Sequence, residues 1–208
     1  MIGLLGPQRC GKSTLAKTYA EAHGIPFVET SASTVFKDMG LNPAKTYDFG
    51  TRMAVQEAIL GRFNEQYFHA PSQAITDRTP LDLMAYTLSE CLNETVPPNL
   101  EDQLDRYIHR CFESLNNYFS IVMLIQPGIA LVAQEGKAGI SRGHIEHMNA
   151  LMFGLMVDPR NRVPSYFMRR QYVSMTERMQ ALEDTTLRAT NLHRNAVNIY
   201  VESGRKLQ

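Results

Sequence analysis

The sequence predicts an α/β protein in which a parallel β-sheet lies between layers of helices, and three observations lead to this prediction. Residues 1–5 have the pattern of a short apolar strand, residues 14–23 have helical periodicity, and residues 25–28 form a second apolar run. The order strand, helix, strand is a βαβ unit, and such units build parallel sheets. A chain of 208 residues is long enough for one domain with a full core.

Apolar runs, helix caps and helix breakers predict the remaining elements. Strands are expected at residues 73–76, 120–125 and 163–168, with the run at 120–125 at the centre of the sheet. Asp48, Thr79 with Asp82, and Ser174 with Glu177 are helix start signals. Helices are expected at residues 30–40, 48–68, 79–92, 100–118, 144–157 and 174–190. Residues 195–203 are expected to form a terminal strand or a packed tail.

The composition is that of an ordinary globular protein, with 44% hydrophobic and 20% charged residues. A formal net charge of zero argues against a surface that coats nucleic acid. The part of the chain after residue 126 is more basic than the part before it, which fits either an anionic substrate or a solvated face.

Cysteine usage and hydropathy predict where the protein works. Cys10, Cys91 and Cys111 have neither a paired nor a metal-type spacing, which indicates a reducing compartment. The first strand pattern begins at Met1, which leaves no room for a signal peptide, and no apolar run approaches the length of a membrane span. We therefore expect a cytoplasmic protein without membrane contact, in the host cytoplasm if the source is viral.

The first strand is followed by a run that matches the phosphate-binding loop G-x-x-x-x-G-K-[ST], also called Walker A. Glycines let backbone N–H groups close around phosphate oxygens, and the next helix points its positive end at the same place. Lys12 is expected to reach the β- and γ-phosphates, and the Ser13 hydroxyl to hold Mg²⁺. The alternative is a glycine-rich turn that happens to precede a helix. The expected contacts to ATP come from Gly6, Gln8, Arg9, Cys10, Gly11, Lys12, Ser13 and Thr14.

Two further strand ends carry charged residues. In an open parallel sheet, ligands bind beyond the carboxyl ends of the strands. Glu29 follows the second predicted strand, and Asp77 with Arg78 follows the third, so all three are expected beside the phosphate loop. The strand at 120–125 ends in Gln126-Pro127-Gly128, without an acid. Asp77 is therefore the best carboxylate for the metal-bound phosphate chain.

The start of the helix at 48–68 predicts a substrate pocket. Arg52 and Gln56 are one helical turn apart and project side by side. With Tyr47 and Phe49 they offer aromatic walls, a cation and an amide that both donates and accepts hydrogen bonds, which suits a nucleobase and a phosphate. An amphipathic helix with two polar surface groups explains the same pattern, and the sequence leaves both interpretations open.

Residues 129–143 are expected to form a lid, because three glycines occur there with Lys137 and Arg142. Closing such a segment excludes water and brings a cation to the transferred phosphoryl group. An ordinary surface loop is the alternative. His144 and His147 lack a carboxylate or cysteine partner at matching spacing, so they do not predict a metal site.

With these motifs in this order, the chain resembles the P-loop nucleoside and nucleotide kinases, the group that contains thymidylate kinase and the deoxynucleoside kinases. The run Asp-Arg-Thr-Pro-Leu-Asp-Leu-Met-Ala-Tyr, residues 77–86, is similar to the Asp/Glu-Arg-Ser/Thr element of that group. It is also similar to small kinase-like proteins of bacteriophages. The resemblance implies a three-layer P-loop NTPase fold, with a five-stranded parallel sheet flanked by helices and a lid segment, over residues 1–208.

The resemblance also implies roles for single residues. Lys12 and Ser13 would hold ATP and Mg²⁺, Asp77 would be linked to the metal or act as a base, and Arg78 would contact the phosphates or the acceptor. Arg142 would be the lid cation. Glu29 occupies the place of the carboxylate that deprotonates a hydroxyl acceptor in deoxynucleoside kinases.

The leading functional hypothesis is a kinase that phosphorylates a deoxynucleoside monophosphate or a closely related nucleotide. A second hypothesis is a kinase for a hydroxyl, either on a nucleoside or on a hydroxymethylated base in phage DNA. A third, of another class, is an ATPase or switch that hydrolyses nucleoside triphosphates. The sequence names neither the acceptor nor the oligomeric state, and a homodimer is one open alternative.

Overall fold

The computed structural model describes residues 1–91, 95–131 and 141–205, with the helical backbone alone for residues 193–205. The strands are β1 (Ile2–Leu5), β2 (Phe27–Val28), β3 (Ile75–Thr76), β4 (Ile121–Ile125) and β5 (Ser165–Met168). The helices are α1 (Lys12–His23), α2 (Ala32–Asp38), α3 (Phe49–His69), α4 (Pro80–Glu90), α5 (Pro98–Tyr118), α6 (Arg142–Met156) and α7 (Met175–Arg205). The strands form one sheet in the order β2-β3-β1-β4-β5.

All the strand pairs are parallel, which confirms the predicted five-stranded parallel sheet. The sheet is centred on β1, in which Ile2 pairs with Ile75 of β3 on one side and with Ile121 of β4 on the other. β4 is interior and wholly buried, as its apolar run predicted, but it lies one place from the centre. Because the strands are parallel, the segments that follow β1 and β3 emerge at the same edge of the sheet.

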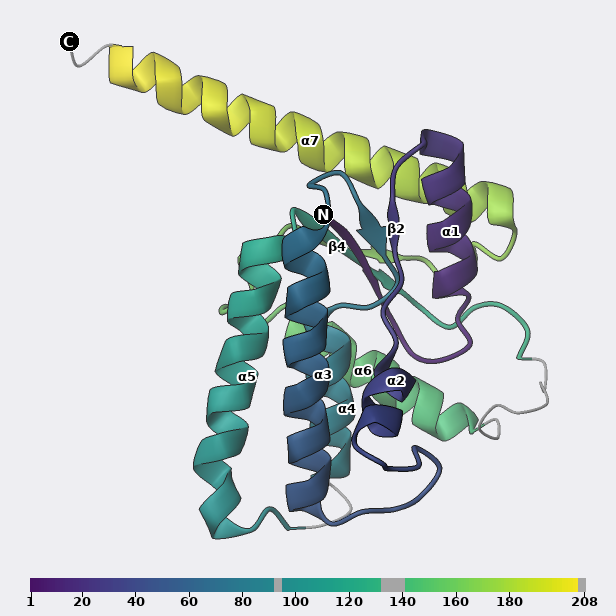
Figure 1. The fold of residues 1–208 in the computed structure, drawn as a ribbon. Coiled ribbons are helices and arrows are strands. Elements are labelled where there is room, and N and C mark those ends of the chain that lie inside the picture. Colours follow the sequence, from purple (N-terminus) through teal and green to yellow (C-terminus); the bar gives the residue numbers. More distant parts are fainter. Residues whose placement is uncertain (92–94, 132–140, 206–208) are drawn as a thin grey trace.

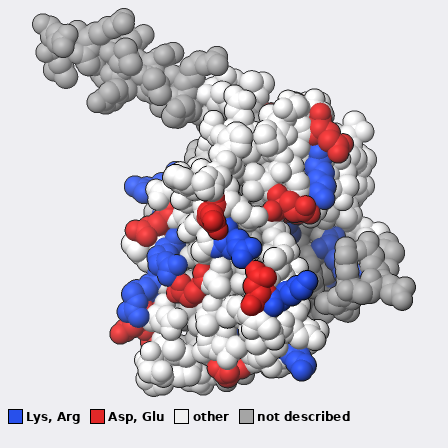
Figure 2. Space-filling model, viewed as in Figure 1, with Lys and Arg blue, Asp and Glu red and all other residues white. Residues whose placement is uncertain are grey.

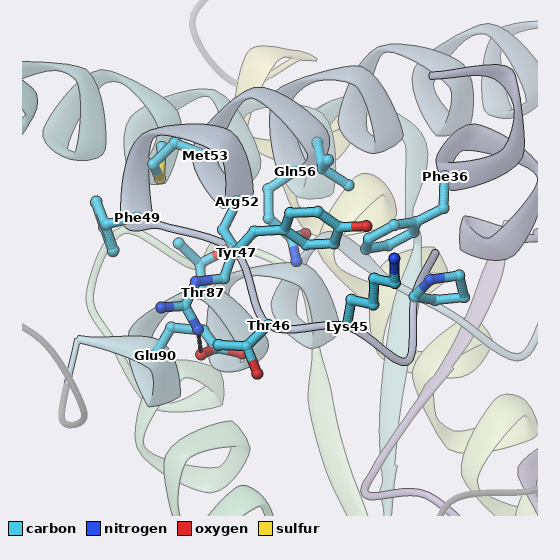
Figure 3. Close-up of a pocket in the computed structure, with 12 residues that line it drawn as sticks. Phe36, Lys45, Thr46, Tyr47, Phe49, Arg52, Met53, Gln56, Thr87 and Glu90 are labelled. Atoms are coloured by element: carbon cyan, nitrogen blue, oxygen red, sulfur yellow. Dashed lines mark hydrogen bonds and ion pairs between the residues drawn. The ribbon is translucent and has the colours of Figure 1, made fainter. Parts of the chain in front are cut away.

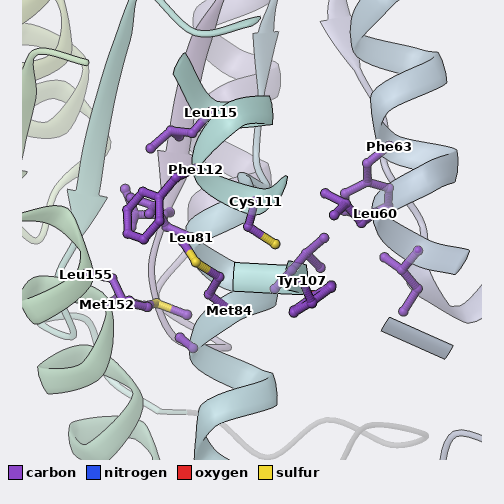
Figure 4. Packing of buried hydrophobic residues seen from close by; sticks show 14 of the residues in the cluster. Leu60, Phe63, Leu81, Met84, Tyr107, Cys111, Phe112, Leu115, Met152 and Leu155 are labelled. Atoms are coloured by element: carbon purple, nitrogen blue, oxygen red, sulfur yellow. The ribbon is translucent and has the colours of Figure 1, made fainter. Parts of the chain in front are cut away.

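Alternate residues of the inner strands face two separate cores, as the period of a β-strand requires. Leu5, Val122 and Leu124 belong to the larger core, and Leu4 and Met123 to the smaller one. Helices α3, α4, α5 and α6 pack on the larger core, whereas α1 and α7 cover the opposite face (Figure 1). Figure 4 shows how the larger core is filled by side chains from facing helices. This is the expected three-layer arrangement.

The predicted helix starts are present. The Asp48 carboxylate accepts a hydrogen bond from the Thr51 N–H group (2.9 Å) and begins α3. Thr79 and Asp82 form a reciprocal capping box at α4. Ser174 and Glu177 do the same before α7, through bonds of 3.1 and 3.3 Å. Local capping chemistry therefore defines where these helices begin.

Two predictions at helix boundaries were wrong. Residues 195–203 are not a strand, because the backbone of α7 continues as a helix to Arg205. Once the cap at Ser174 has started the helix, no proline follows and no glycine occurs before Gly204, so helix propagation prevails over the β-branched residues near the end.

The second wrong boundary concerns the lid. Ser141 caps α6 by accepting a hydrogen bond from the His144 N–H group, so residues 142–143 belong to the helix and not to a loop. The greater part of the predicted lid, residues 132–140, lies outside the described residues. None of the helices in the described ranges is long and apolar enough to cross a membrane.

Phe63→Ala tests the larger core. Phe63 is fully buried on α3, so we expect the free energy of unfolding to fall by about 3–5 kcal/mol in urea denaturation. Phe68 lies on the same helix but is 71% exposed, and Phe68→Ala should change the same quantity by about 0.5 kcal/mol or less. Equal effects of the two substitutions would contradict this packing.

Candidate active site

The phosphate loop, residues 6–13, runs from the end of β1 into α1. Three of its residues have a positive φ, namely Gly6 (149°), Arg9 (64°) and Gly11 (79°). A Cβ atom on Gly6 would lie 2.5 Å from the backbone oxygen of Ile125, so only glycine fits there. The first turn of α1 contains no acidic residue and receives no side-chain cap. The positive end of α1 is therefore available to an anion, as the motif predicted.

Lys12 lies inside this loop and is buried. Its ammonium group donates hydrogen bonds to the Gly6 carbonyl and to the Pro7 carbonyl (3.0 Å), and Nζ lies 3.9 Å from the Cys10 sulfur. The lysine thus binds the carbonyl groups of its own loop. A bound phosphate would compete with these neutral acceptors for the same ammonium group.

Ser13 and Asp77 meet at the edge of the sheet. The Ser13 hydroxyl donates a hydrogen bond to Asp77 Oδ2, although the two residues are far apart in the sequence. Asp77 follows β3 and is partly exposed. A hydroxyl and a carboxylate are the oxygen ligands that Mg²⁺ accepts, usually with phosphate oxygens and water completing the octahedron. No group of three His, Cys, Asp or Glu side chains that could hold a metal occurs among the described residues. Phosphate oxygens and water would therefore have to complete the coordination of Mg²⁺ at Ser13 and Asp77.

Asp82 is a site residue that the sequence analysis recognised only as a helix cap. Its carboxylate is fully buried and accepts hydrogen bonds from the Gly6 N–H group (3.3 Å) and from the N–H and hydroxyl groups of Thr79 (both 2.9 Å). Burial raises the pKa of Asp82, against the opposing charges of Lys12 and Arg78. The sequence did contain a signal for this role. The capping box that includes Asp82 directly follows the charged strand end, so the first turn of α4 had to lie beside the phosphate loop.

Arg78 lies between Asp82 and an aromatic ring. The carbon at the centre of its guanidinium is 5.8 Å from the centre of the Tyr86 ring. Burial alone would lower the pKa of Arg78, but Asp82, Tyr86 and Asp77 together raise it, so the side chain remains a cation. Its backbone carbonyl accepts a hydrogen bond from Tyr67 (3.0 Å). The strand end thus holds a fixed positive charge next to Asp77.

Glu29 follows β2 as expected, but its carboxylate points to α1. It is exposed and forms an ion pair with Lys17 at 3.7 Å. Its backbone oxygen accepts a hydrogen bond from the Gln66 side chain (3.1 Å). The structure therefore does not place the Glu29 carboxylate against Ser13 or in the pocket described next.

A pocket of about 610 Å³ opens between the start of α3, the end of α4 and the segment that leads into α3 (Figure 3). It brings together Tyr47, Phe49, Arg52 and Gln56, the four residues predicted to form it, whereas Arg78, the fifth residue predicted to contact the substrate, is not among its lining residues. The remaining lining residues are Phe36, Pro43, Lys45, Thr46, Met53, Val55, Thr87 and Glu90. The volume is typical of a site for a small organic ligand.

Polar groups in the pocket are arranged around a buried amide. The Gln56 Oε1 atom is buried and has no hydrogen-bond partner among the described residues. Arg52 forms an ion pair with Glu90, which lies 38 residues away on α4. The Tyr47 hydroxyl accepts a hydrogen bond from the Asn42 N–H group (2.8 Å), so its ring is held as part of the wall. Glu90 was not expected, because the sequence does not show which residue of α4 faces Arg52.

The remaining predicted residues belong to the phosphate loop, to the first turn of α1 and to the start of α6. Gln8 and Arg9 are half-buried, Cys10 is buried, and Thr14 is exposed in the first turn of α1. Arg142 is exposed at the start of α6, next to the segment that the structure does not describe. Whether any of these contacts a ligand stays a prediction.

Comparison with known proteins agrees with this geometry. A family profile described as an AAA domain matches residues 1–117. No curated protein matches the chain.

Similar folds occur in solved structures of nucleoside and nucleotide kinases. A deoxyadenosine kinase from M. mycoides with bound dATP has a TM-score of 0.65 at 17% identity, over 89% of this chain and 98% of that one. Thymidylate kinase from Candida albicans has a TM-score of 0.56 at 15% identity, over 91% and 92%. The YorR protein from Bacillus subtilis, in complex with phosphorylated GDP, has a TM-score of 0.51 at 15% identity, over 89% and 94%. At these identities the likeness shows the fold, which is that of the P-loop nucleoside and nucleotide kinases.

Asp82→Asn tests the buried carboxyl. The new amide turns an N–H group toward the donors of Gly6 or Thr79, so we expect a loss of about 1–3 kcal/mol in the free energy of unfolding. The pKa of Asp82 is raised in the folded protein. The difference in the free energy of unfolding between wild type and Asp82→Asn should therefore be largest below about pH 4, and it should decline as the pH rises through the raised pKa. Urea denaturation of both proteins between about pH 4 and pH 8 measures this difference.

Asp48→Asn is the matched control, because Asn caps an exposed helix start as well as Asp does. The hydrogen bonds from Thr51 lower the pKa of Asp48, so the pH trend at that site should have the opposite sign. An advantage of wild type over Asp82→Asn that grows with pH would refute the raised pKa of Asp82.

Proposed function

Since this chain belongs to the AAA domain family, we propose that it is a P-loop kinase that transfers the γ-phosphate of ATP to a nucleotide-type acceptor, in the first place a (deoxy)nucleoside monophosphate. The observation that carries this proposal is the hydrogen bond between Ser13 and Asp77. It joins the end of the phosphate loop to a carboxylate from a different strand. That pairing suits a magnesium–triphosphate complex better than a glycine-rich turn without a ligand.

The residues of the loop would bind the donor. Backbone N–H groups and Lys12 would surround the phosphates, and Ser13 with Asp77 would hold Mg²⁺, which would neutralise charge on the phosphate chain. Arg78 keeps its positive charge at the strand end, where it can stabilise negative charge on the transferred group or on an acceptor phosphate. Phosphoryl transfer depends mainly on such positioning and charge stabilisation.

The pocket on α3 and α4 supports a nucleobase as part of the acceptor. Gln56 offers a buried amide, and the ion pair of Arg52 with Glu90 presents both donors and acceptors without a net charge. The edge of a nucleobase also carries both hydrogen-bond donors and acceptors, whereas a phosphate carries acceptors and negative charge. The polar groups of the pocket therefore suit a base better than a phosphate. The rings of Tyr47 and Phe49 add apolar wall.

The charge distribution on the face drawn in Figure 2 suits a small nucleotide better than a duplex. Figure 2 shows basic and acidic side chains interleaved on the face that carries α3 and α5, without a basic patch. Pairs such as Arg110 with Glu57 and Arg62 with Asp38 account for part of this pattern. A DNA substrate would need positive charge collected along one path.

A second candidate acceptor is a hydroxyl group, on a nucleoside or on a hydroxymethylated base, and the position of Glu29 favours it. Glu29 follows β2 at the edge of the sheet where the phosphate loop lies, and its exposed ion pair with Lys17 is of the kind that contributes little energy. A side chain held so weakly can turn toward an acceptor and take its proton. A monophosphate is already ionised and needs no base.

The decisive experiment offers ATP labelled in the γ-phosphate together with nucleosides, nucleoside monophosphates or DNA. Label in a phosphorylated acceptor supports the proposal. Label in free phosphate alone, with every acceptor tested, would make the protein an ATPase or switch and defeat the proposed function.

Asp77→Asn should reduce transfer by about 100-fold or more and raise the Mg²⁺ concentration needed for activity, because it removes a charged metal ligand. The fold should be unchanged by circular dichroism, since Asp77 is partly exposed. Asp38→Asn, at an exposed surface ion pair, is the control and should retain activity. Wild-type Mg²⁺ dependence in Asp77→Asn would remove Asp77 from the metal site.

Glu29→Gln separates the two acceptor types. For a hydroxyl acceptor the loss of a general base should lower kcat by about 10²- to 10⁴-fold, and for a monophosphate acceptor kcat should stay close to wild type. Steady-state kinetics with the acceptor found above measures the effect. Glu21→Gln, at an exposed position of α1, controls for the loss of one surface charge.

A further inference from the structure

Arg178 joins the last helix to the phosphate loop. It lies in the first turns of α7 and is only 4% exposed. Its Nη2 atom donates a hydrogen bond to the Cys10 carbonyl (2.7 Å), and its Nε atom lies 3.5 Å from the Met168 sulfur. A Cβ atom on Gly11 would lie 2.6 Å from Nη1. The guanidinium is therefore packed directly on the peptide between Cys10 and Gly11.

Within the part of the chain that the structure describes, this buried cation has no acidic partner. Other arginines of the chain are paired, for example Arg52 with Glu90 and Arg170 with Glu146. None of the ion pairs among the described residues includes Arg178. Burial lowers the pKa of its side chain. A buried charge that meets only a carbonyl and a thioether is costly to the folded protein, unless an anion comes close enough to offset it.

The contact with Cys10 also sets the direction of a loop N–H group. In a trans peptide the C=O and N–H groups point to opposite sides. By holding the Cys10 carbonyl, Arg178 fixes the N–H group of Gly11 on the other side of the same peptide. Gly11 has a φ of 79° and is the residue before α1, where the motif needs N–H groups that face phosphate.

We propose that Arg178 is a positioning residue for the nucleotide: it orients the Cys10–Gly11 peptide, and bound phosphate compensates its buried charge. This inference rests on the proposed function, because it requires the loop to bind a phosphate chain. It has a consequence for α7. Nucleotide binding stabilises the contact of α7 with the loop, whereas the empty protein carries an unpaired charge at that contact.

The rest of α7 is attached independently of Arg178, which makes the test possible. The Tyr19 hydroxyl of α1 lies 3.1 Å from the Thr186 hydroxyl of α7, and His23 lies 3.2 Å from Glu183. These contacts join the second half of α1 to α7, and the two helices lie side by side in Figure 1. A variant at Thr186 therefore loosens α7 without touching Cys10.

The test measures ATP affinity and thermal unfolding of the full chain, with and without magnesium–ATP. For Arg178→Met we expect the Kd for ATP to rise by about 10- to 100-fold, the usual effect of losing a charge-assisted hydrogen bond. The Tm of the ligand-free variant should equal or exceed that of wild type, because an uncompensated buried charge is gone. Arg178→Lys keeps the charge and should restore part of the affinity.

Two controls separate positioning from simple docking. Thr186→Val should lower the Tm and leave the Kd for ATP unchanged. Arg188→Met removes an exposed arginine of the same helix and should change neither quantity. If Arg178→Met lowers the Tm of the ligand-free protein and leaves the Kd within twofold of wild type, Arg178 only docks the helix and the inference is overturned.

The remaining outcomes are also decisive. Should Arg178→Met fail to fold, Arg178→Lys decides alone: a raised Kd at unchanged Tm supports the inference, and an unchanged Kd overturns it. A wild-type protein that binds ATP but transfers no phosphate refutes the proposed function and leaves this inference intact. A wild-type protein that does not bind ATP refutes both.

Discussion

The site depends on how the backbone of the phosphate loop is held in a shape that accepts an anion. A loop that turns several N–H groups toward one point must turn its carbonyl groups elsewhere, and those need partners when they are buried. Two side chains from outside the loop bind its backbone, one at its first residue and one at its middle. Asp82 of α4 accepts from the Gly6 N–H group, and Arg178 of α7 donates to the Cys10 carbonyl. The loop is thus supported from both faces of the sheet.

The charges around the loop explain why an anion is favoured there. Lys12, Arg78 and Arg178 contribute three cations, while Asp77 and Asp82 are the acids, and the positive end of α1 adds to the excess. Burial raises the pKa of Asp82, against the charges of Lys12 and Arg78. Among the described residues, Lys12 and Arg178 donate hydrogen bonds to carbonyl groups and sulfur. A phosphate chain would add negative charge beside cations that Asp77 and Asp82 offset only in part.

Local signals in the sequence predicted the elements and much of the site. The phosphate loop, the cap at Asp48 and the capping box at Thr79 depend on residues close together in the chain, and all are present. The pocket around Tyr47, Phe49, Arg52 and Gln56 was predicted because helical spacing brings those side chains together.

What the sequence could not show are the contacts across the fold. Glu90 meets Arg52 only because α4 packs against α3, and Arg178 meets Cys10 only because α7 returns to α1. Neither contact can be predicted from the spacing of apolar residues within one helix or strand. The error at residues 195–203 has a different source, since β-branched residues favoured a strand locally while a helix already under way continued through them.

Helix α4 connects the two halves of the site. Its first turn carries Asp82, which binds the phosphate loop, and its last turn carries Glu90, which binds Arg52 in the pocket. Glu90 lies eight positions after Asp82 along the helix, a rise of about 12 Å. The helix is capped at its start and buried along most of its length, so it cannot easily change that distance. A rigid spacer of this kind fixes the separation between the phosphate loop and the floor of the pocket. Transfer between two bound molecules requires such a fixed separation, because small errors in the placement of the reacting atoms reduce the rate strongly.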